Sequence, residues 1–304
     1  MRRRPLAALL LAALLLATAV LGACGSPAAD ADPPADGVVR VASYDFPENQ
    51  TLAEVYAEAV RRAGFEVAVQ HGIGTREVVF PALEQGVVDL VVDYLGTASE
   101  FLEAGAGTAS HDPAVLRDRL AAAVAPRGLT VLAPAEAEDQ NGFVVLTDTA
   151  ARHGVTTLSG LAAIAPRLVF GGPPECSERR FCLPGLREVY GIEFGEVRSM
   201  PSRAATAEAL LTGQVDVGML ETTDARLTDA SLHLLRDDRA LQPRENVVPL
   251  VRTEVAAEGG EPLRAALDAV SAQLTTIDLI RLNRFVAVDG LTPAEAAARW
   301  WDGR

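Results

Sequence analysis

The strongest constraint on the fold is an alternation of short apolar runs with segments of helical periodicity. Residues 38–43 are rich in β-branched side chains, which is typical of a strand, and residues 52–63 place apolar side chains on one helical face. A second predicted strand at 65–69 precedes a helix that begins near Thr75 and ends at Gly86, and residues 87–92 follow as a third strand. Strands and helices that alternate at this spacing predict parallel α/β layers.

The alternation repeats after residue 141. We predict strands at 143–146, 168–170 and 215–220, helices at 158–165 and 204–211, and a mostly helical tail at 262–301 whose last helix begins at Pro293. The polar residues 136–141 are expected to form the first crossing between two lobes, and residues 246–250 the return crossing. Residues 38–138 and 247–304 would then form lobe 1, and residues 139–246 lobe 2. A cleft between two lobes is a favoured place for a ligand.

The N-terminal residues have the pattern of an export signal. Three arginines at 2–4 precede an apolar run at 6–21, and small residues follow. The run is too short to be read as a lasting membrane span. Residues 25–37 contain only Gly, Ser, Pro, Ala and Asp, which is typical of a flexible tether.

The residues at 21–24, Leu-Gly-Ala-Cys, resemble the lipobox of bacterial lipoproteins. This resemblance implies that residues 1–23 are a lipoprotein signal peptide and that Cys24 is acylated. Residues 24–37 would then tether an extracytoplasmic protein to the cell membrane. The alternative is an ordinary signal peptide with an incidental cysteine.

Composition narrows the possible partners. Apolar residues make up 49% of the chain, so we expect a substantial core. The net charge of −14 argues against binding to nucleic acid or to anionic lipid head groups. Tyr56 and Phe65 lie on apolar faces and are expected in the core, and the Trp300-Trp301 pair is expected to pack there rather than to bind a ligand.

Cys176 and Cys182 are the remaining cysteines, and in an exported chain a disulfide between them is expected. It would close a small loop and contribute about 2–3 kcal/mol. A metal site is the alternative, but no histidine lies near either cysteine. The four histidines show no paired spacing for a metal, so we expect neither a metal site nor a cofactor.

An ordered set of segments resembles the glycine betaine and osmoprotectant-binding proteins of ABC importers. The set covers residues 38–300 and comprises residues 43–50, 71–75, 84–90, 93–98, 183–186, 190–191, 213–217, 223–224 and 235–238. The resemblance implies an α/β, two-lobed type II periplasmic-binding fold that closes on a small zwitterion or quaternary amine. It also implies delivery of that ligand to an ABC permease and its ATPase, and we expect a monomer.

The resemblance also indicates a ligand site. A trimethylammonium group is held by aromatic faces and carboxylates, and a carboxylate tail by arginine, hydroxyl or backbone N–H groups. Tyr94 matches the family's cage tyrosine, with Thr97 close behind it. Four further candidates lie where strands end or helices begin, at the edge of the sheet where α/β proteins bind ligands: Tyr44, Asp45, Gln50 and Thr75. For Tyr94 the alternative role is capping the sheet edge; for Asp45, Gln50 and Thr75 it is helix capping or solvation.

Two positions depart from the family pattern. Glu221 stands where the family has a tyrosine, and Arg244 lies in a loop where the family has an aromatic residue. Glu221 is therefore expected to pair directly with a cationic ligand, which favours an amine that can donate hydrogen bonds. Arg244 would bind a carboxylate or pair with Glu221 or Glu245.

Catalysis is not indicated. The chain has no Gly-x-Ser-x-Gly elbow, no His-Glu-x-x-His pair and no phosphate loop. A non-catalytic solute receptor is the leading interpretation. A ligand-sensing lipoprotein of the same fold and a lipid-anchored enzyme are the alternatives.

Overall fold

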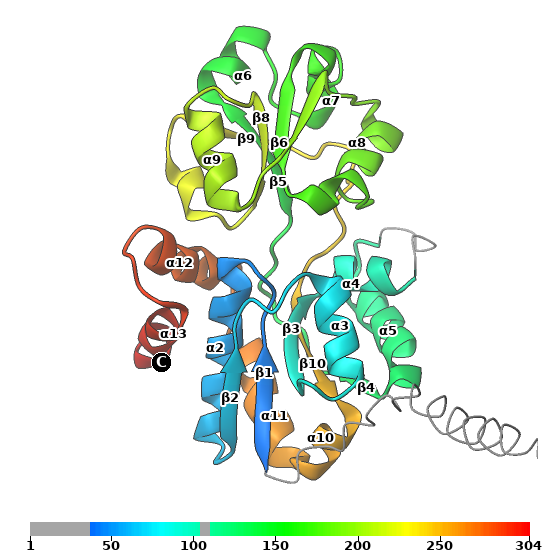
Figure 1. Ribbon diagram of the computed structural model, residues 1–304, viewed down its shortest axis with the longest axis vertical. Coiled ribbons are helices and arrows are strands. Elements are labelled where there is room, and N and C mark those ends of the chain that lie inside the picture. The colour runs from blue at the N-terminus through cyan, green and yellow to red at the C-terminus, as the bar shows by residue number, and fades with distance from the viewer. Residues whose placement is uncertain (1–36, 104–109) are drawn as a thin grey trace, which may run out of the picture. The chain divides into compact units, whose positions relative to one another are not determined.

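The computed structural model describes residues 37–103 and 110–304. They form two five-stranded mixed sheets flanked by helices (Figure 1). The predicted signal peptide, Cys24 and residues 24–36 of the predicted tether lie outside the described residues. Within the described residues, no helix is both long and apolar enough to cross a membrane.

The first lobe is built on a sheet with the strand order β2-β1-β3-β10-β4. β1 is parallel to β2 and β3, whereas β10 is antiparallel to β3 and β4. The strands are β1 (Val38–Ala42), β2 (Glu66–Gln70), β3 (Leu90–Tyr94), β4 (Leu129–Val131) and β10 (Val247–Arg252). The predicted parallel alternation is therefore confirmed for β1 to β3, while the antiparallel β10 comes from the far end of the chain.

Helices cover both faces of this sheet. They are α2 (Pro47–Arg62), α3 (Arg76–Glu84), α4 (Leu95–Leu102), α5 (Pro113–Val124) with the 3₁₀ turn η1 (Ala125–Arg127), α10 (Thr253–Glu258), α11 (Gly260–Ser271), α12 (Thr276–Ala287) and α13 (Pro293–Asp302). α2 begins earlier than the predicted residue 52 because Pro47 supplies the fixed φ that suits a first helical turn. Pro293 begins α13 as predicted.

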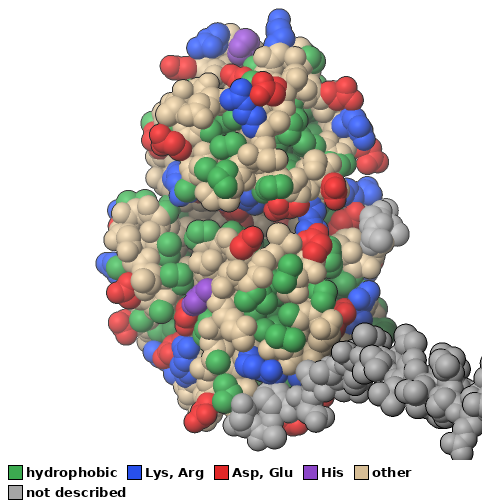
Figure 2. All heavy atoms as spheres, in the orientation of Figure 1, with side chains coloured by type: hydrophobic (Ala, Val, Ile, Leu, Met, Phe, Trp, Pro, Cys, Tyr) green, Lys and Arg blue, Asp and Glu red, His purple; other side chains and the backbone are tan. Residues whose placement is uncertain are grey.

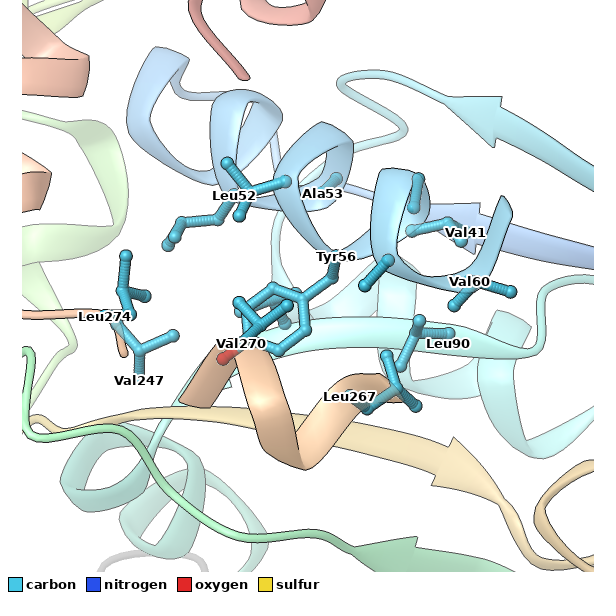
Figure 3. Close-up of a cluster of buried hydrophobic side chains, with 14 of the residues drawn as sticks. Val41, Leu52, Ala53, Tyr56, Val60, Leu90, Val247, Leu267, Val270 and Leu274 are labelled. Carbon is cyan, nitrogen blue, oxygen red and sulfur yellow. The ribbon is translucent and has the colours of Figure 1, made fainter. Parts of the chain in front are cut away.

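The core under α2 is centred on Tyr56, which is fully buried. Figure 3 shows its ring between α2 and α11, beside Leu267 and Val270. Its hydroxyl lies 2.9 Å from the Ser271 hydroxyl, so its one polar atom is satisfied. The core prediction for Tyr56 is confirmed. Phe65 is partly buried and packs against the same cluster.

The tryptophan pair packs against this core as well. Trp300 is 6% exposed, and the indole N–H of Trp301 donates to the Val55 carbonyl at 3.1 Å. The prediction that both rings serve packing is confirmed.

The second lobe is built on a sheet with the order β7-β6-β8-β5-β9. Its strands are β5 (Asn141–Leu146), β6 (Val169–Gly172), β7 (Glu196–Ser199), β8 (Val217–Glu221) and β9 (Leu232–Leu235). Its helices and turns are α6 (Thr147–His153), α7 (Leu158–Leu161), η2 (Ala165–Arg167), η3 (Pro174–Ser177), α8 (Leu183–Tyr190), α9 (Arg203–Leu211) and η4 (Ala225–Thr228).

Two chain crossings connect the sheets, and an isolated antiparallel bridge pairs Glu138 with Asn246 where they run together. The expectation of a return crossing at 246–250 is wrong for most of that range, because residues 247–250 lie inside β10. These residues are all buried, as expected for an apolar run in a strand covered on both faces. The return crossing therefore ends at Asn246.

Candidate functional site in the cleft between the lobes

A cavity of about 390 Å³ lies between the lobes. Figure 2 shows this boundary as a groove where acidic and basic side chains meet. Lining residues come from both sheets and from both crossings: Tyr44, Asp45, Phe46, Thr75, Arg76, Tyr94, Thr97, Glu100, Phe101, Asp139, Gln140, Asn141, Pro173, Glu175, Cys176, Glu178, Arg179, Arg180, Phe181, Cys182, Arg203, Met219, Glu221 and Glu245.

Three aromatic rings form a row along the first lobe's side of the cavity. Phe46 lies between Tyr44 and Tyr94, with both centroid separations at 6.2 Å and interplanar angles of 9° and 29°. Tyr44 follows β1 and Tyr94 ends β3, so two adjacent parallel strands deliver their rings to the same edge of the sheet. Aromatic faces attract cations, and the guanidinium of Arg76 already lies over the Tyr44 ring, 5.3 Å from its centroid.

Asp93 holds one end of this row. Its carboxylate accepts hydrogen bonds from the Tyr44 hydroxyl at 2.5 Å and from Arg76 Nη2 at 2.5 Å and Nε at 3.1 Å. Arg76 Nη2 also donates to Thr97 Oγ1 at 2.9 Å. Burial, together with the Asp93 charge, raises the pKa of Tyr44 well above its ordinary value. Tyr44 therefore remains a neutral hydrogen-bond donor. The guanidinium of Arg76 is paired with the Asp93 carboxylate.

Glu48 holds the other end. It is buried on α2, and its Oε1 accepts a hydrogen bond from the Tyr94 hydroxyl at 2.7 Å. Its Oε2 accepts from the Thr223 hydroxyl, which belongs to the second lobe, and from Asn283 Nδ2 at 2.6 Å. Burial raises the pKa of Glu48, although these three donors oppose the shift. Tyr94 is thus held by a carboxylate that also contacts the second lobe.

Glu245 closes the cavity from the return crossing. Its Oε2 accepts hydrogen bonds from the Gly96 and Thr97 backbone N–H groups, both at 3.1 Å, and from Thr97 Oγ1 at 3.3 Å. This approach requires glycine at 96, because a Cβ there would lie 2.3 Å from Pro243 Cγ. Burial raises the pKa of Glu245 to about 8.

The second lobe contributes an ion pair and a buried acid. Arg203, at the start of α9, donates to Glu221 at the end of β8. Asp139 lies in the first crossing and accepts from Thr222 Oγ1 at 3.1 Å and from the Thr223 backbone N–H at 3.2 Å. Burial, followed by the charges of Glu48 and Glu221, raises the pKa of Asp139 well above its ordinary range.

A disulfide lies on the second lobe's side of the cavity. Cys176 and Cys182 are bonded, as predicted, six residues apart. Arg179 and Arg180, inside the closed loop, reach across to the first lobe. Arg179 Nη2 lies 2.6 Å from a carboxylate oxygen of Glu77, and Arg180 Nε lies 3.9 Å from one of Glu100.

Six of the predicted ligand-site residues line the cavity: Tyr44, Asp45, Thr75, Tyr94, Thr97 and Glu221. Gln50 and Arg244 do not line it. Gln50 lies on α2 with its side-chain amide toward Gly72, and Arg244 is exposed and pairs with Glu138 at 2.5 Å rather than with Glu221 or Glu245. Glu221, expected to face a ligand cation, has Arg203 as its partner.

Sequence reasoning missed Phe46, Arg76 and Glu245 among the lining residues. Arg76 had a detectable signal, because a cation in the first turn of a helix opposes the helix dipole and calls for another reason to be there. Glu245 had none, since an acidic residue in a polar loop is usually solvated. In the described residues, no group of three or more potential metal ligands converges.

Two α/β lobes joined by two crossings, with an aromatic and charged cavity between them, define a solute-binding protein of the type II periplasmic-binding fold. Residues 37–303 match the family model for the substrate binding domain of ABC-type glycine betaine transport systems, and the chain belongs to this family. Proteins of this family bind small ligands outside the cytoplasm and deliver them to the permease of an ABC importer.

Two relatives align over most of the chain. A glycine-betaine-binding protein of Pseudomonas aeruginosa is 27% identical over 300 residues, covering 95% of this chain and 93% of that protein. Glycine betaine-binding protein YehZ of Escherichia coli is 25% identical over 270 residues, covering 86% and 88%. A crystal structure of a glycine betaine/carnitine/choline ABC transporter shares the fold, with a TM-score of 0.70 at 21% identity, over 87% of this chain and 98% of that one.

Proposed function

We propose that the cavity captures a small quaternary amine or zwitterion, of the glycine betaine type, and that the chain hands it to an ABC permease without catalysing a reaction. The observation that carries this proposal is the row of Tyr44, Phe46 and Tyr94 along the cavity. A trimethylammonium group has no hydrogen to donate, so stacked aromatic faces are the chemistry that suits it. The names of the relatives point to the same ligand class.

The charge of the cavity supports an ammonium group as the recognised part of the ligand. Seven acidic and four basic side chains line it. Each arginine in the lining lies within 4 Å of a carboxylate: Arg76 of Asp93, Arg179 of Glu77, Arg180 of Glu100 and Arg203 of Glu221. Even with Asp139 and Glu245 protonated, five acidic side chains face four arginines, so the excess charge is negative and complements a cation.

We also propose the organisation of the whole chain around this site. Residues 1–23 would be a signal peptide, acylated Cys24 the membrane anchor, and residues 24–37 the tether of a monomer. Lobe 1 would comprise residues 38–138 and 247–304, and lobe 2 residues 139–246. The membership of β1 to β4 and β10 in one sheet and of β5 to β9 in the other supports these lobe limits.

Calorimetric titration tests the ligand class. The chain from residue 25 onward keeps every described element and would be titrated with glycine betaine, choline, carnitine, proline betaine, ectoine, amino acids and polyamines. We expect saturable binding of at least one quaternary amine. At 100 times its dissociation constant, that ligand should add about 2.7 kcal/mol to the free energy of unfolding and raise the melting temperature by several degrees. Absence of binding by every quaternary amine and zwitterion in the panel would overturn the proposal.

A further inference from the structure

Glu245 uses its two carboxylate oxygens differently. The side chain lines the cavity, and the residue is only 2% exposed. All three hydrogen bonds that it receives go to Oε2. Oε1 is buried and has no hydrogen-bond partner among the described residues. A buried carboxylate oxygen without a donor is costly, so the ionised form of Glu245 lacks part of the stabilisation that a nearby positive charge would supply.

The charged groups around Glu245 leave one positive charge missing. They are Arg76 on α3, Asp93 on β3 and Asp139 in the first crossing, whose backbone N–H donates to the Glu245 carbonyl at 3.1 Å. Arg76 directs two of its N–H groups to Asp93. Ionised Asp93 and Glu245 thus share a single guanidinium, and Asp139 provides no positive charge.

Glu245 is also connected to the aromatic row through a short chain of contacts. Thr97 Oγ1 donates to Glu245 Oε2 at 3.3 Å and accepts from Arg76 Nη2 at 2.9 Å. Arg76 Cζ in turn lies 5.3 Å from the centroid of the Tyr44 ring. Glu245 and the Tyr44 end of the aromatic row therefore lie in the same part of the cavity, close enough for the Glu245 charge to act on a cation held by the row.

We propose that Glu245 is the anionic anchor of the ligand's ammonium group and makes the site select a net cation, such as choline, over a zwitterion, such as glycine betaine. This inference rests on the proposed function and narrows its ligand class. In the free protein, burial raises the pKa of Glu245 to about 8, so the carboxyl group holds a proton at neutral pH. A bound cation favours the carboxylate and displaces that proton. A zwitterion brings its own carboxylate. Each arginine of the lining is already paired with a protein carboxylate, so the cavity offers this second carboxylate no free positive charge.

The test measures proton release when choline binds. At pH 7 a group with a pKa near 8 is mostly protonated, so titration in buffers of different ionisation enthalpy should show a net release of protons when choline binds. The dissociation constant for choline should fall several-fold between pH 6.5 and 7.5. In Glu245→Gln, the proton release and the pH dependence should disappear, and choline should bind at least about tenfold more weakly.

The matched control is Glu138→Gln, which makes the same charge change at the neighbouring crossing, outside the cavity lining. It should retain wild-type proton release and affinity for choline. The melting temperature of each ligand-free variant checks its folding, and the proton release of the wild type needs no variant at all.

The outcomes separate this inference from the function on which it rests. Four outcomes would each overturn the role of Glu245 and leave the proposed function standing. They are quaternary-amine binding without proton release, equal proton release in Glu245→Gln, an equal loss of affinity in Glu138→Gln, and tighter binding of glycine betaine than of choline. If no amine binds at all, both the role of Glu245 and the proposed function are contradicted.

Discussion

The Thr223 hydroxyl donates a hydrogen bond to Glu48 Oε2 and so joins the second lobe to α2 of the first lobe. Asn283 on α12 supports this contact by donating to Glu48 Oε2 at 2.6 Å and to the Thr223 carbonyl at 3.1 Å. Because Glu48 also receives the Tyr94 hydroxyl, the junction between the lobes is connected directly to the aromatic row. A substitution at this junction should therefore change both the free energy of unfolding and the position of Tyr94 in the proposed ligand site.

Thr223→Val tests the junction. Valine keeps the shape of threonine but removes the hydroxyl, which leaves Glu48 with one donor fewer in a buried position. We expect the free energy of unfolding to fall by about 1–3 kcal/mol, measured by urea denaturation. The control is Thr212→Val, because Thr212 is exposed at the end of α9 and bonds only within its own helix. The control should change stability by less than about 0.5 kcal/mol, and an equal loss in both variants would contradict a role for the junction.

Stability should decrease as the pH rises through the neutral range. The pKa of buried Asp139 is raised, so the folded state holds its proton more tightly than the unfolded state does. The resulting stabilisation is fully present below the unfolded pKa, near 3.9, and is lost as the pH rises through the folded pKa. The raised pKa values of Glu48 and Glu245 act in the same direction.

Asp139→Asn isolates this effect, because the amide keeps an acceptor for Thr222 and Thr223 but does not ionise. Urea denaturation at pH 5, 6, 7 and 8 should show a shallower decline in the variant than in the wild type. Asp118→Asn, at an exposed position on α5, should follow the wild-type curve. A decline in Asp139→Asn as steep as that of the wild type would show that Asp139 is not ionising over this range.

Phe46→Leu tests the aromatic row. Leucine keeps an apolar side chain between Tyr44 and Tyr94 but removes the π face. We expect quaternary-amine affinity to fall by about 1–2 kcal/mol, which is roughly a factor of 5 to 30, as measured by calorimetry. The ligand-free protein should melt close to the wild type, because Phe46 is only partly buried. An unchanged dissociation constant would mean that the ligand does not lie against this row.

Reduction of the disulfide should destabilise the protein. The Cys176–Cys182 bond closes a short loop that carries Arg179 and Arg180 to the first lobe. Chain entropy predicts a loss of about 2–3 kcal/mol on reduction. The melting temperature of the wild type should therefore drop in dithiothreitol, whereas Cys176→Ser/Cys182→Ser should melt at the lower temperature with or without it. A wild-type melting curve insensitive to the reductant, with reduction verified by thiol titration, would refute the expected contribution.

Glu221→Gln should shift ligand preference toward zwitterions. Glu221 pairs with Arg203 in the cavity wall, and the amide would release the guanidinium to bind a ligand carboxylate. We expect the ratio of the glycine betaine to choline dissociation constants to fall at least about threefold. Glu254→Gln removes a carboxylate far from the cavity lining and should leave the ratio unchanged. A shift toward choline in Glu221→Gln would contradict this function of Glu221.

Local pattern was enough to predict much of the first lobe. Helical and strand periodicity predicted β1, α2, β2 and α3 because the spacing of apolar residues shows which face is buried, whatever that face packs on; α2 packs mainly on α13 and α11 from the far end of the chain. Composition and spacing likewise predicted the cysteine bond, and the burial of Tyr56 followed from its position on an apolar helical face. In each of these cases the prediction needed only a local periodicity or a short spacing, not the identity of a distant partner.

The hydrogen-bond and ion-pair partners of the predicted ligand-site residues could not be inferred from local pattern. Tyr94 was identified from a family motif, yet its partner Glu48 lies 46 residues away on another element. Arg244 and Glu245 are adjacent in one polar loop, but the fold leaves Arg244 exposed and buries Glu245 in the cavity.

The amino-acid sequence by itself determined the secondary-structure alternation, the two-lobed class and the family, because these depend on local periodicity and on ordered motifs. The tertiary structure alone decided which charges are satisfied. Burial and pairing depend on contacts such as Glu245 with Gly96, 149 residues apart, and the cost of burying a charge is set by those distant neighbours rather than by the residue itself.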